Sequence, residues 1–183
     1  MPGSYRFVVL DQPLANAHAA VEKAAAALRE SMQHPRLVTQ VRYGEAPVHQ
    51  VASNRRILGP DGKVKAVRWS STVDPAVRAE PEGMIDPLAR VLSFWNGDKP
   101  VVALTYYATH PQSKYGQGRV SADFPGLARK QLADTIGIPV LHFDGAGGNV
   151  TAGKYNDGNI ANRPILAGRL FEEIGRASCR ERV

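Results

Sequence analysis

Residues 88–108 read LARVLSFW-NGDK-PVVALTYYA, and this stretch decides the fold. Two runs rich in β-branched and aromatic residues, Leu88–Trp95 and Pro100–Ala108, flank four residues in which turn formers dominate. That is the pattern of a β-hairpin. The second run leads into Thr109-His110, so a histidine leaves a buried strand at its carboxyl end. Such a position is well suited to binding a metal or transferring a proton.

A strand, a helix and a second strand follow one another from this hairpin onward. The helix is predicted from Asp123, which offers an N-cap, with Pro125 just inside its start and Gly137 at its stop. A short apolar strand, Pro139–Phe143, comes next. We expect this strand to run parallel to Pro100–Ala108, with the helix as the crossover between them. The sequence therefore predicts an α/β domain with a mixed sheet.

The remaining elements follow from periodicity and from turn residues. The expected helices are Pro13–Met32, which is rich in alanine, and a last helix that begins near Ile160 or Asn162. The expected strands are Arg6–Leu10, Arg36–Tyr43 and Val64–Trp69, the last after a hairpin turn at Asp61-Gly62, while Gly44–Pro60 and Ser70–Pro87 are expected to be loops.

Composition excludes several classes of protein. Of the chain's 183 residues, 43% are hydrophobic and 22% are charged, which excludes a disordered tail. A chain of this length corresponds to about one domain. No apolar run approaches the ~18 residues that a membrane helix needs, and no signal peptide is visible. The basic residues are scattered, which argues against a nucleic-acid interface.

The last residues, Ile174–Val183, resemble the in-frame translation of a common short-read sequencing adapter. We therefore expect the natural domain to occupy residues 1–173 and to be truncated at both ends. Removing three arginines and one glutamate with this stretch lowers the formal net charge from +6 to +4. The only cysteine, Cys179, falls in it as well, so cysteine content is uninformative about redox compartment. Such a stretch is expected to bury little apolar surface, so its deletion should leave thermal stability nearly unchanged.

Four segments carry residues suited to chemistry. The first is Ala108-Thr-His110-Pro-Gln-Ser113, and the second is the glycine-rich loop Gly145–Gly153, whose backbone N–H groups could serve an oxyanion. The third is Asn54-Arg55, since arginine binds carboxylates and oxyanions. The fourth is Ser121-Ala-Asp123-Phe-Pro-Gly126. Each also has a plain structural reading: a strand-end histidine, a flexible turn, a solvated arginine and a helix cap.

Taken in order, these segments resemble the neutral/alkaline non-lysosomal ceramidase family. That family has an Asn-Arg element, a strand ending in Ala-x-His-x-x-Ser, a helix start Ser-x-Asp-x-x-Gly and a loop Gly-Asp-Val-Ser-Pro-Asn. The loop's counterpart here is Gly148-Asn-Val-Thr151-Ala-Gly153. Thr151 thus stands in place of the family's serine, Asn149 in place of its aspartate, and Ala152-Gly153 in place of Pro-Asn.

The resemblance implies a zinc-dependent amidohydrolase that cleaves an N-acylsphingosine-like lipid or a related amide. It implies His110 as a zinc ligand, Thr151 as the nucleophile, and Asn54, Arg55, Gly148 and Asn149 as substrate-binding residues. The family's other zinc ligands, a His-x-His segment, a glutamate and a tyrosine, lie outside this chain. By the same resemblance the protein is exported or periplasmic.

Two functions stay open at this point. The first is a zinc amidohydrolase, of which this chain is an inactive part because it supplies one zinc ligand instead of three. The second is a non-catalytic relative that keeps the fold and the glycine-rich loop but binds a ligand without hydrolysing it. The geometry tests the first directly, because His110 and Thr151 must then lie within about 10 Å of each other, a span that a metal ion and a carbonyl can bridge. Arg55 should reach the same cleft.

Overall fold

A computed structural model describes residues 11–116 and 120–179. The chain divides into two compact units, residues 1–37 and 38–183. The first unit holds helix α1 (Asp11–Gln33), which confirms the predicted alanine-rich helix. The strand expected at Arg6–Leu10 lies outside the described residues.

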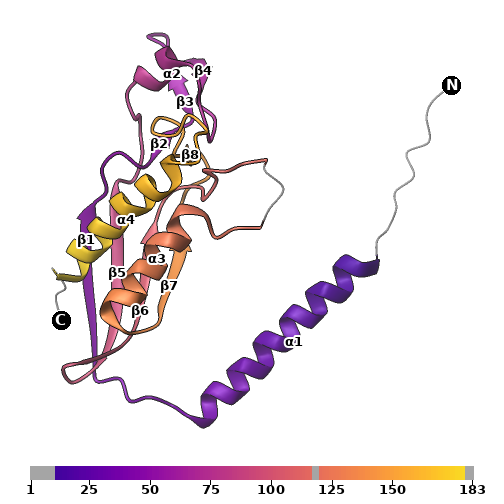
Figure 1. The fold of residues 1–183 in the computed structure, drawn as a ribbon, viewed down its shortest axis with the longest axis vertical. Coiled ribbons are helices and arrows are strands. Elements are labelled where there is room, and N and C mark those ends of the chain that lie inside the picture. Colours follow the sequence, from indigo (N-terminus) through magenta and orange to yellow (C-terminus); the bar gives the residue numbers. More distant parts are fainter. Residues whose placement is uncertain (1–10, 117–119, 180–183) are drawn as a thin grey trace. The chain divides into compact units, whose positions relative to one another are not determined.

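A four-stranded mixed sheet forms the centre of the second unit (Figure 1). Its order is β1 (Gln40–Pro47), β5 (Leu88–Asn96), β6 (Lys99–Tyr107) and β7 (Val140–Asp144). β5 pairs antiparallel with both β1 and β6, and β6 pairs with β7 in parallel. Helix α3 (Asp123–Ile136) connects β6 to β7. The predicted hairpin, parallel pair and crossover helix are all confirmed.

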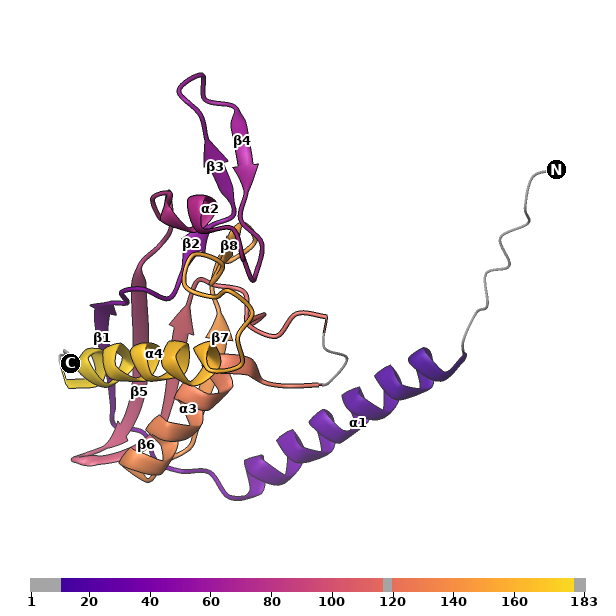
Figure 2. The ribbon, with the colours of Figure 1, turned by 45° about the horizontal axis from the view of Figure 1, so that its top comes forward.

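Two helices cover one face of the sheet. α3 lies over β7, while α4 (Asn162–Cys179) lies beside α3 and over β1 and β5 (Figure 2). The strands present small or short side chains on this face, so the helices pack closely. The buried core beneath them includes Ala89, Val91, Ala103 and Val140 from the strands and Phe124, Ala128, Leu132, Leu166 and Leu170 from the helices.

The opposite face of the sheet is apolar as well. The register aligns Tyr43 with Leu92, Leu92 with Leu104, and Leu104 with Leu141. Phe143 stacks on Tyr106 with ring centroids 5.2 Å apart. Tyr43 and Phe143 nevertheless remain 44% exposed. An exposed apolar surface of this extent is typical of a contact surface.

Short elements build the part of the unit beyond the carboxyl end of β6. β2 (Ser53–Asn54) pairs with β8 (Val150–Thr151), and β3 (Arg56–Leu58) pairs with β4 (Val64–Val67). The β3–β4 hairpin turns at Asp61-Gly62 as predicted, with Gly62 at a φ of 73°. The sequence reading of 44–60 and 70–87 as loops missed β2, β3 and the short helix α2 (Pro75–Ala79).

The strand predicted at Arg36–Tyr43 is shifted in the structure. It begins at Gln40 and continues to Pro47, because Gly44 pairs with Val91 and Pro47 with Leu88. Pairing with a neighbouring strand outweighs the local pattern that favoured residues 36–39.

The carboxyl-terminal helix runs through the stretch that resembles adapter sequence. Ile174 and Ala177 are both 0% exposed and continue the buried stripe of Leu166 and Leu170. This differs from the expectation that residues 174–183 bury little apolar surface. Apolar residues at helical spacing suffice to extend α4, whatever the origin of their codons.

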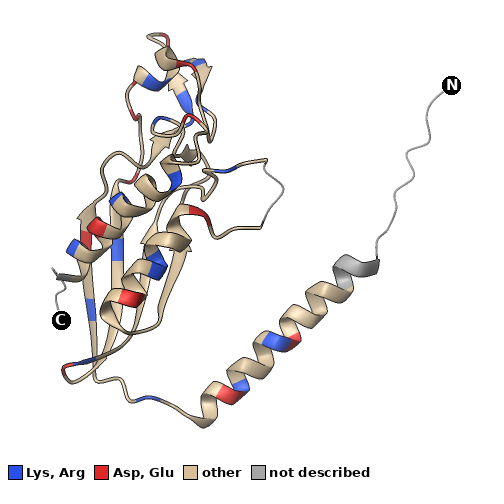
Figure 3. Cartoon of the chain, in the orientation of Figure 1, with Lys and Arg blue, Asp and Glu red and all other residues tan. Residues whose placement is uncertain are grey.

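Charged residues are spread over many elements (Figure 3). Lysine and arginine occur on strands, helices and loops, interspersed with acidic residues. Within the described ranges no helix combines the length and the hydropathy that crossing a bilayer requires.

Candidate active site

The parallel pair β6–β7 brings two of the predicted segments to one edge of the sheet. β6 ends at Tyr107 and continues into Thr109-His110, while β7 ends at Asp144 and continues into the glycine-rich loop and β8 (Figure 2). The His110 N–H donates to the Val150 carbonyl over 3.0 Å. His110 therefore lies beside Val150, the residue that precedes Thr151 in β8. The expected distance between the His110 and Thr151 side chains stays a prediction.

The imidazole of His110 is fixed by the glycine-rich loop. Its Nδ1 lies 2.7 Å from the Gly147 carbonyl oxygen and 3.1 Å from that of Val150. A carbonyl can only accept, so Nδ1 carries the proton and Nε2 keeps its lone pair in the neutral ring. Metal-binding histidines in proteins are usually oriented by this kind of bond from the other ring nitrogen.

The glycines of this loop allow close contact with the end of β6. A Cβ on Gly145 would lie 3.2 Å from the Ala108 Cα, and one on Gly147 would lie 3.1 Å from backbone atoms of Thr109. None of Gly145, Gly147, Gly148 and Gly153 has a positive φ. Gly145 and Gly147 instead let two backbones approach, which holds His110 in place.

Thr151 lies in β8 and is 0% exposed. Its hydroxyl donates to the Trp69 carbonyl over 3.3 Å and accepts the Gly153 N–H over 3.3 Å. The side chain is thus oriented by backbone groups on both sides.

Asn54, Arg55 and Asn149 are brought together although 95 residues separate the two asparagines. The Asn149 amide donates to Asn54 Oδ1 over 2.6 Å, and the Arg55 N–H donates to the Asn149 carbonyl over 2.8 Å. The Arg55 guanidinium lies 5.2 Å from the centre of the Trp69 ring. Asn54 and Asn149 fix the loop and the base of Arg55, while the Arg55 head group stays available.

Arg55 and His110 line one cavity of about 350 Å³. Its other walls are Trp69, Ser70, Ser71, Gln112 and Tyr115. The prediction that Arg55 reaches the cleft of His110 is therefore met. A smaller cavity of about 200 Å³ places Asp144 and Gly148 on the other side of His110.

The fourth segment organises the loop after His110. The Ser113 hydroxyl donates to the Asp123 carboxylate, which also accepts the Phe124 N–H over 2.6 Å. Asp123 is 4% exposed and begins α3 at a φ of 51°, so it ties the loop to the helix start; the predicted N-cap position is occupied by Ala122 instead. Gly126 is required here, since a Cβ on it would lie 2.2 Å from the Ala122 Cβ.

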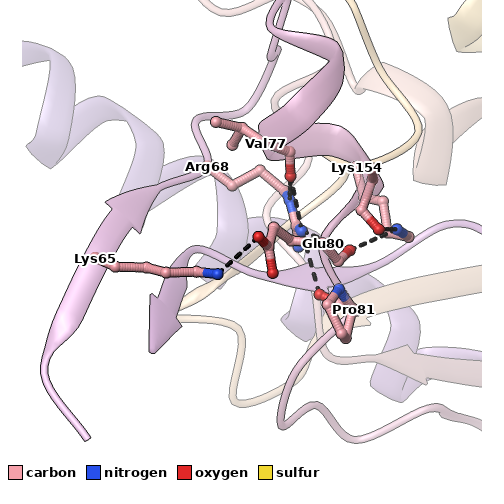
Figure 4. Close-up of polar contacts among 7 residues, drawn as sticks. Lys65, Arg68, Val77, Glu80, Pro81 and Lys154 are labelled. Carbon is pink, nitrogen blue, oxygen red and sulfur yellow. Dashed lines mark hydrogen bonds and ion pairs between the residues drawn. The ribbon is translucent and has the colours of Figure 1, made fainter. Parts of the chain in front are cut away.

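Two cations that the sequence analysis did not single out support the site, and they are the buried Arg68 and the half-buried Lys154 (Figure 4). Arg68 is 0% exposed and donates to the carbonyls of Val77, Glu80 and Pro81 over 2.9–3.2 Å. Lys154 Nζ donates to the carbonyls of Arg78, Ala79 and Glu80 over 2.5–3.2 Å. Together they satisfy the carboxyl end of α2.

These cations sit in a partly desolvated region. Burial lowers the pKa of Arg68, and burial followed by the nearby Arg68 charge lowers the pKa of Lys154. Lys154 follows Gly153 directly, and a Cβ on Gly153 would lie 1.8 Å from the Trp69 carbonyl oxygen. The chain after Thr151 is therefore held between α2 and Trp69.

Asn156 is a further residue that sequence reasoning missed. It is 0% exposed, and its amide donates to the carbonyls of Ser70 and Ser113 over 2.9 and 3.0 Å. It joins the two loops that line the cavity. The only local signal is an asparagine in a glycine-rich stretch, which is common in exposed turns.

A zinc ion would need nitrogen, sulfur or oxygen ligands from the side chains of this site. His110 fits a zinc ligand, because its Nδ1 proton is committed to a carbonyl and Nε2 is left to coordinate. Among residues 11–116 and 120–179, no three His, Cys, Asp or Glu side chains lie close enough to hold an ion. The described part of the chain thus does not supply by itself the three protein ligands of a catalytic zinc site.

Comparison with known proteins yields matches in structure alone. No family model and no curated protein sequence matches the chain. Two solved structures share its fold: a ceramidase complexed with C2, with a TM-score of 0.53 and 16% identity, and the neutral ceramidase from Pseudomonas aeruginosa, with 0.54 and 17%. Each match covers 77% of this chain and 23% of the solved one. The chain therefore has a ceramidase-like fold and spans about a quarter of those structures, which confirms the predicted resemblance at the level of the fold.

Proposed function

We propose that this chain is part of a zinc-dependent hydrolase that cleaves an amide bond, as the ceramidases of similar fold suggest. The observation that carries the proposal is the state of His110. Its ring is fixed through Nδ1 at the edge where two parallel strands end, and it shares a cavity with Arg55. Ligands of open α/β sheets bind at such edges.

His110 would hold the metal through Nε2, with the remaining ligands supplied by other parts of the protein. When bound, zinc polarises the carbonyl of the substrate and stabilises negative charge on its oxygen. The residues of this chain would orient the substrate against that position.

Arg55 would stabilise the developing oxyanion from the cavity wall. A guanidinium is always charged and offers several fixed donors, which suits this role. Gly148 is exposed beside His110 and could contribute its backbone N–H. Asn54 and Asn149 would act on substrate mainly by positioning Arg55 and the loop, because their side chains bond to each other.

Thr151 would be the nucleophile. The Gly153 N–H that it accepts favours a more negative oxygen, and the Trp69 carbonyl holds its proton. Attack requires this hydroxyl to turn from the Trp69 carbonyl towards the substrate. The substrate would be an N-acylsphingosine-like lipid or a related N-acyl amide.

The test follows the histidine ring nitrogens by NMR while Zn²⁺ is added to the 183-residue chain. We expect His110 Nε2 to shift at lower zinc concentration than the exposed His49, with the Nδ1 proton retained. H110Q should remove this early event and H49Q should not. Zinc that binds equally well to wild type and H110Q contradicts the metal assignment.

The nucleophile is tested in a protein that also supplies the other zinc ligands. There T151A should lower hydrolysis of an N-acyl amide by about a millionfold, the scale found when a serine nucleophile is removed. T135A, on the exposed surface of α3, is the matched control. Full activity of T151A would exclude Thr151 as the nucleophile.

A further inference from the structure

A second cavity adjoins the one that holds His110. It has a volume of about 370 Å³ and shares Gln112 and Tyr115 with the first cavity. A ligand that occupies both therefore passes Gln112 and Tyr115. The second cavity has no role in the chemistry described above, which uses His110, Arg55 and Thr151.

Two cations line this second cavity. Lys114 comes from the loop after His110, and Arg163 comes from the first turn of α4. Arg163 is held by a hydrogen bond of 2.5 Å from its NH2 group to the Ser121 hydroxyl. That hydroxyl also accepts the Asp123 N–H over 3.0 Å, so the arginine is attached to the start of α3.

One donor of Arg163 is left unused. Its Nε is buried and has no hydrogen-bond partner among the described residues. A buried donor without a partner is costly unless a ligand or water satisfies it. Arg163 lines the cavity, so a turn of its guanidinium would bring this unused donor to an acceptor from outside the chain.

The one acidic residue of the cavity does not oppose an anion strongly. Asp123 also lines the cavity, but its carboxylate accepts from the Ser113 hydroxyl, the Phe124 N–H and the Lys114 N–H. These three donors point at the carboxylate and offset part of its negative charge. Gln112 is oriented as well, since its Oε1 accepts from the Ser70 hydroxyl over 2.9 Å.

We propose that the cavity lined by Lys114 and Arg163 is an anion subsite, which takes a carboxylate or phosphate group of the substrate. This rests on the proposed amide hydrolysis at His110 and refines it. The preferred substrate is an N-acyl amide that carries an acidic group a few bonds from the scissile carbonyl. A guanidinium binds both oxyanions through paired N–H donors, while lysine adds charge.

The test measures binding without zinc and without turnover. N-acetylglycine, inorganic phosphate and the neutral N-acetylglycinamide are titrated into the 183-residue chain, and the arginine Nε–H resonances are followed by NMR. We expect N-acetylglycine and phosphate to shift the Arg163 Nε–H, and N-acetylglycinamide to leave it in place. R163K serves to assign the signal.

K114Q and R163Q should each weaken N-acetylglycine binding about tenfold, as expected for loss of a charge-assisted hydrogen bond. R56Q removes the same charge at an exposed position outside this cavity and should change affinity less than about twofold. K114Q needs no packing change, so it keeps the test valid if R163Q fails to fold. A response to phosphate alone assigns the subsite to phosphate-bearing substrates.

Equal shifts with N-acetylglycine and N-acetylglycinamide would overturn the proposal in favour of a neutral polar subsite. Equal losses in K114Q and R56Q would also overturn it, because binding would then depend on overall charge. Zinc binding at His110 is read from separate signals. An unresponsive Arg163 beside a responsive His110 therefore rejects the anion subsite alone.

Discussion

The helix-covered sheet and the loops at its carboxyl edge are stabilised by different forces. Under α3 and α4 the contacts are apolar, and Leu166, Leu170 and Ile174 are fully buried against short strand side chains. At the edge, side chains instead satisfy backbone carbonyls, as Arg68 and Lys154 do at the end of α2. Apolar packing depends on volume, whereas the edge depends on particular donors and on particular glycines.

This difference predicts how each region responds to substitution. An apolar core tolerates exchange of residues of similar size, and the cost of truncation grows with the cavity left behind. A buried carbonyl that loses its donor has no substitute. Single substitutions should therefore destabilise the loops at the carboxyl edge more than the helix-covered sheet.

The largest effect is expected at Gly153. A Cβ there would lie 1.8 Å from the Trp69 carbonyl oxygen, which is backbone and cannot yield easily. We expect G153A to cost about 4 kcal/mol in the free energy of unfolding, above the usual range for overpacking. Urea denaturation of G153A and wild type measures this difference in the free energy of unfolding.

The matched control is G168A in α4, where a Cβ meets nothing within 4 Å. It should stabilise the chain by about 0.5–1 kcal/mol through helix propensity. If both variants prove equally stable, the close approach at Gly153 is wrong.

Substitution of Arg68 should cause the second largest loss of stability. R68M keeps most of the side-chain volume but removes the donors to Val77, Glu80 and Pro81, and we expect a loss of about 3 kcal/mol. R56M, at an exposed arginine, should change stability by less than about 0.5 kcal/mol. Similar melting temperatures for the two variants would show that the edge does not depend on this cation.

Ile174 tests the apolar side of the comparison. It is 0% exposed, so I174A should cost about 2–3 kcal/mol, near the lower end for such truncations because Ile174 is close to the end of α4. I165A, 49% exposed on the same helix, should cost under about 1 kcal/mol. An unchanged melting temperature for I174A would support the view that residues 174–183, which we still propose to be adapter-derived, are not part of the folded domain.

The smallest effect depends on pH and concerns His142 on β7. Its Nδ1 bonds to the Thr105 hydroxyl over 2.8 Å. Nε2 is buried, has no hydrogen-bond partner among the described residues and lies 3.9 Å from Asp144 Oδ1. Burial lowers the pKa of His142; the nearby Asp144 carboxylate opposes this shift and Arg129 adds to it. The unfolded chain therefore takes up a proton at a pH where the folded chain does not.

Stability contributed by neutral His142 is present above pH ~6.5 and is lost as the pH falls below it, by at most about 1.4 kcal/mol per pH unit. H142N should flatten the stability profile between pH 5 and 7, and H49N at an exposed position should leave it as in wild type. A steep profile retained in H142N would assign the loss to other groups.

Most of the sheet could be predicted because its signals are local. Residues 88–108 carry strand-forming residues on both sides of Asn96-Gly97, and α3 has a proline near its start and a glycine at its stop. α2 was missed although Asp74 and Pro75 form a cap, because five residues give no periodicity. β2 and β8 have two residues each, and only their pairing defines them.

The candidate site was predicted in part. His110, Arg55 and Thr151 stand out by residue type, and the structure brings their segments together. Arg68, Lys154 and Asn156 could not be found in this way. In sequence a buried lysine or arginine looks like a solvated one, and the carbonyls that they satisfy come from a helix that had not been predicted.

The β2–β8 ladder has a consequence for the order of folding. Ser53 and Thr151 pair across 98 residues of chain, whereas β5 and β6 are joined by a two-residue turn. Closing a loop of that length costs about 4 kcal/mol of chain entropy beyond the constant term, and only two residue pairs offset it. The β5–β6 hairpin can form in microseconds, but the ladder has to wait for the sheet to be in place. The segments that carry the chemistry are therefore assembled last, and the Thr151 amide is expected to exchange its hydrogen well before those of β5.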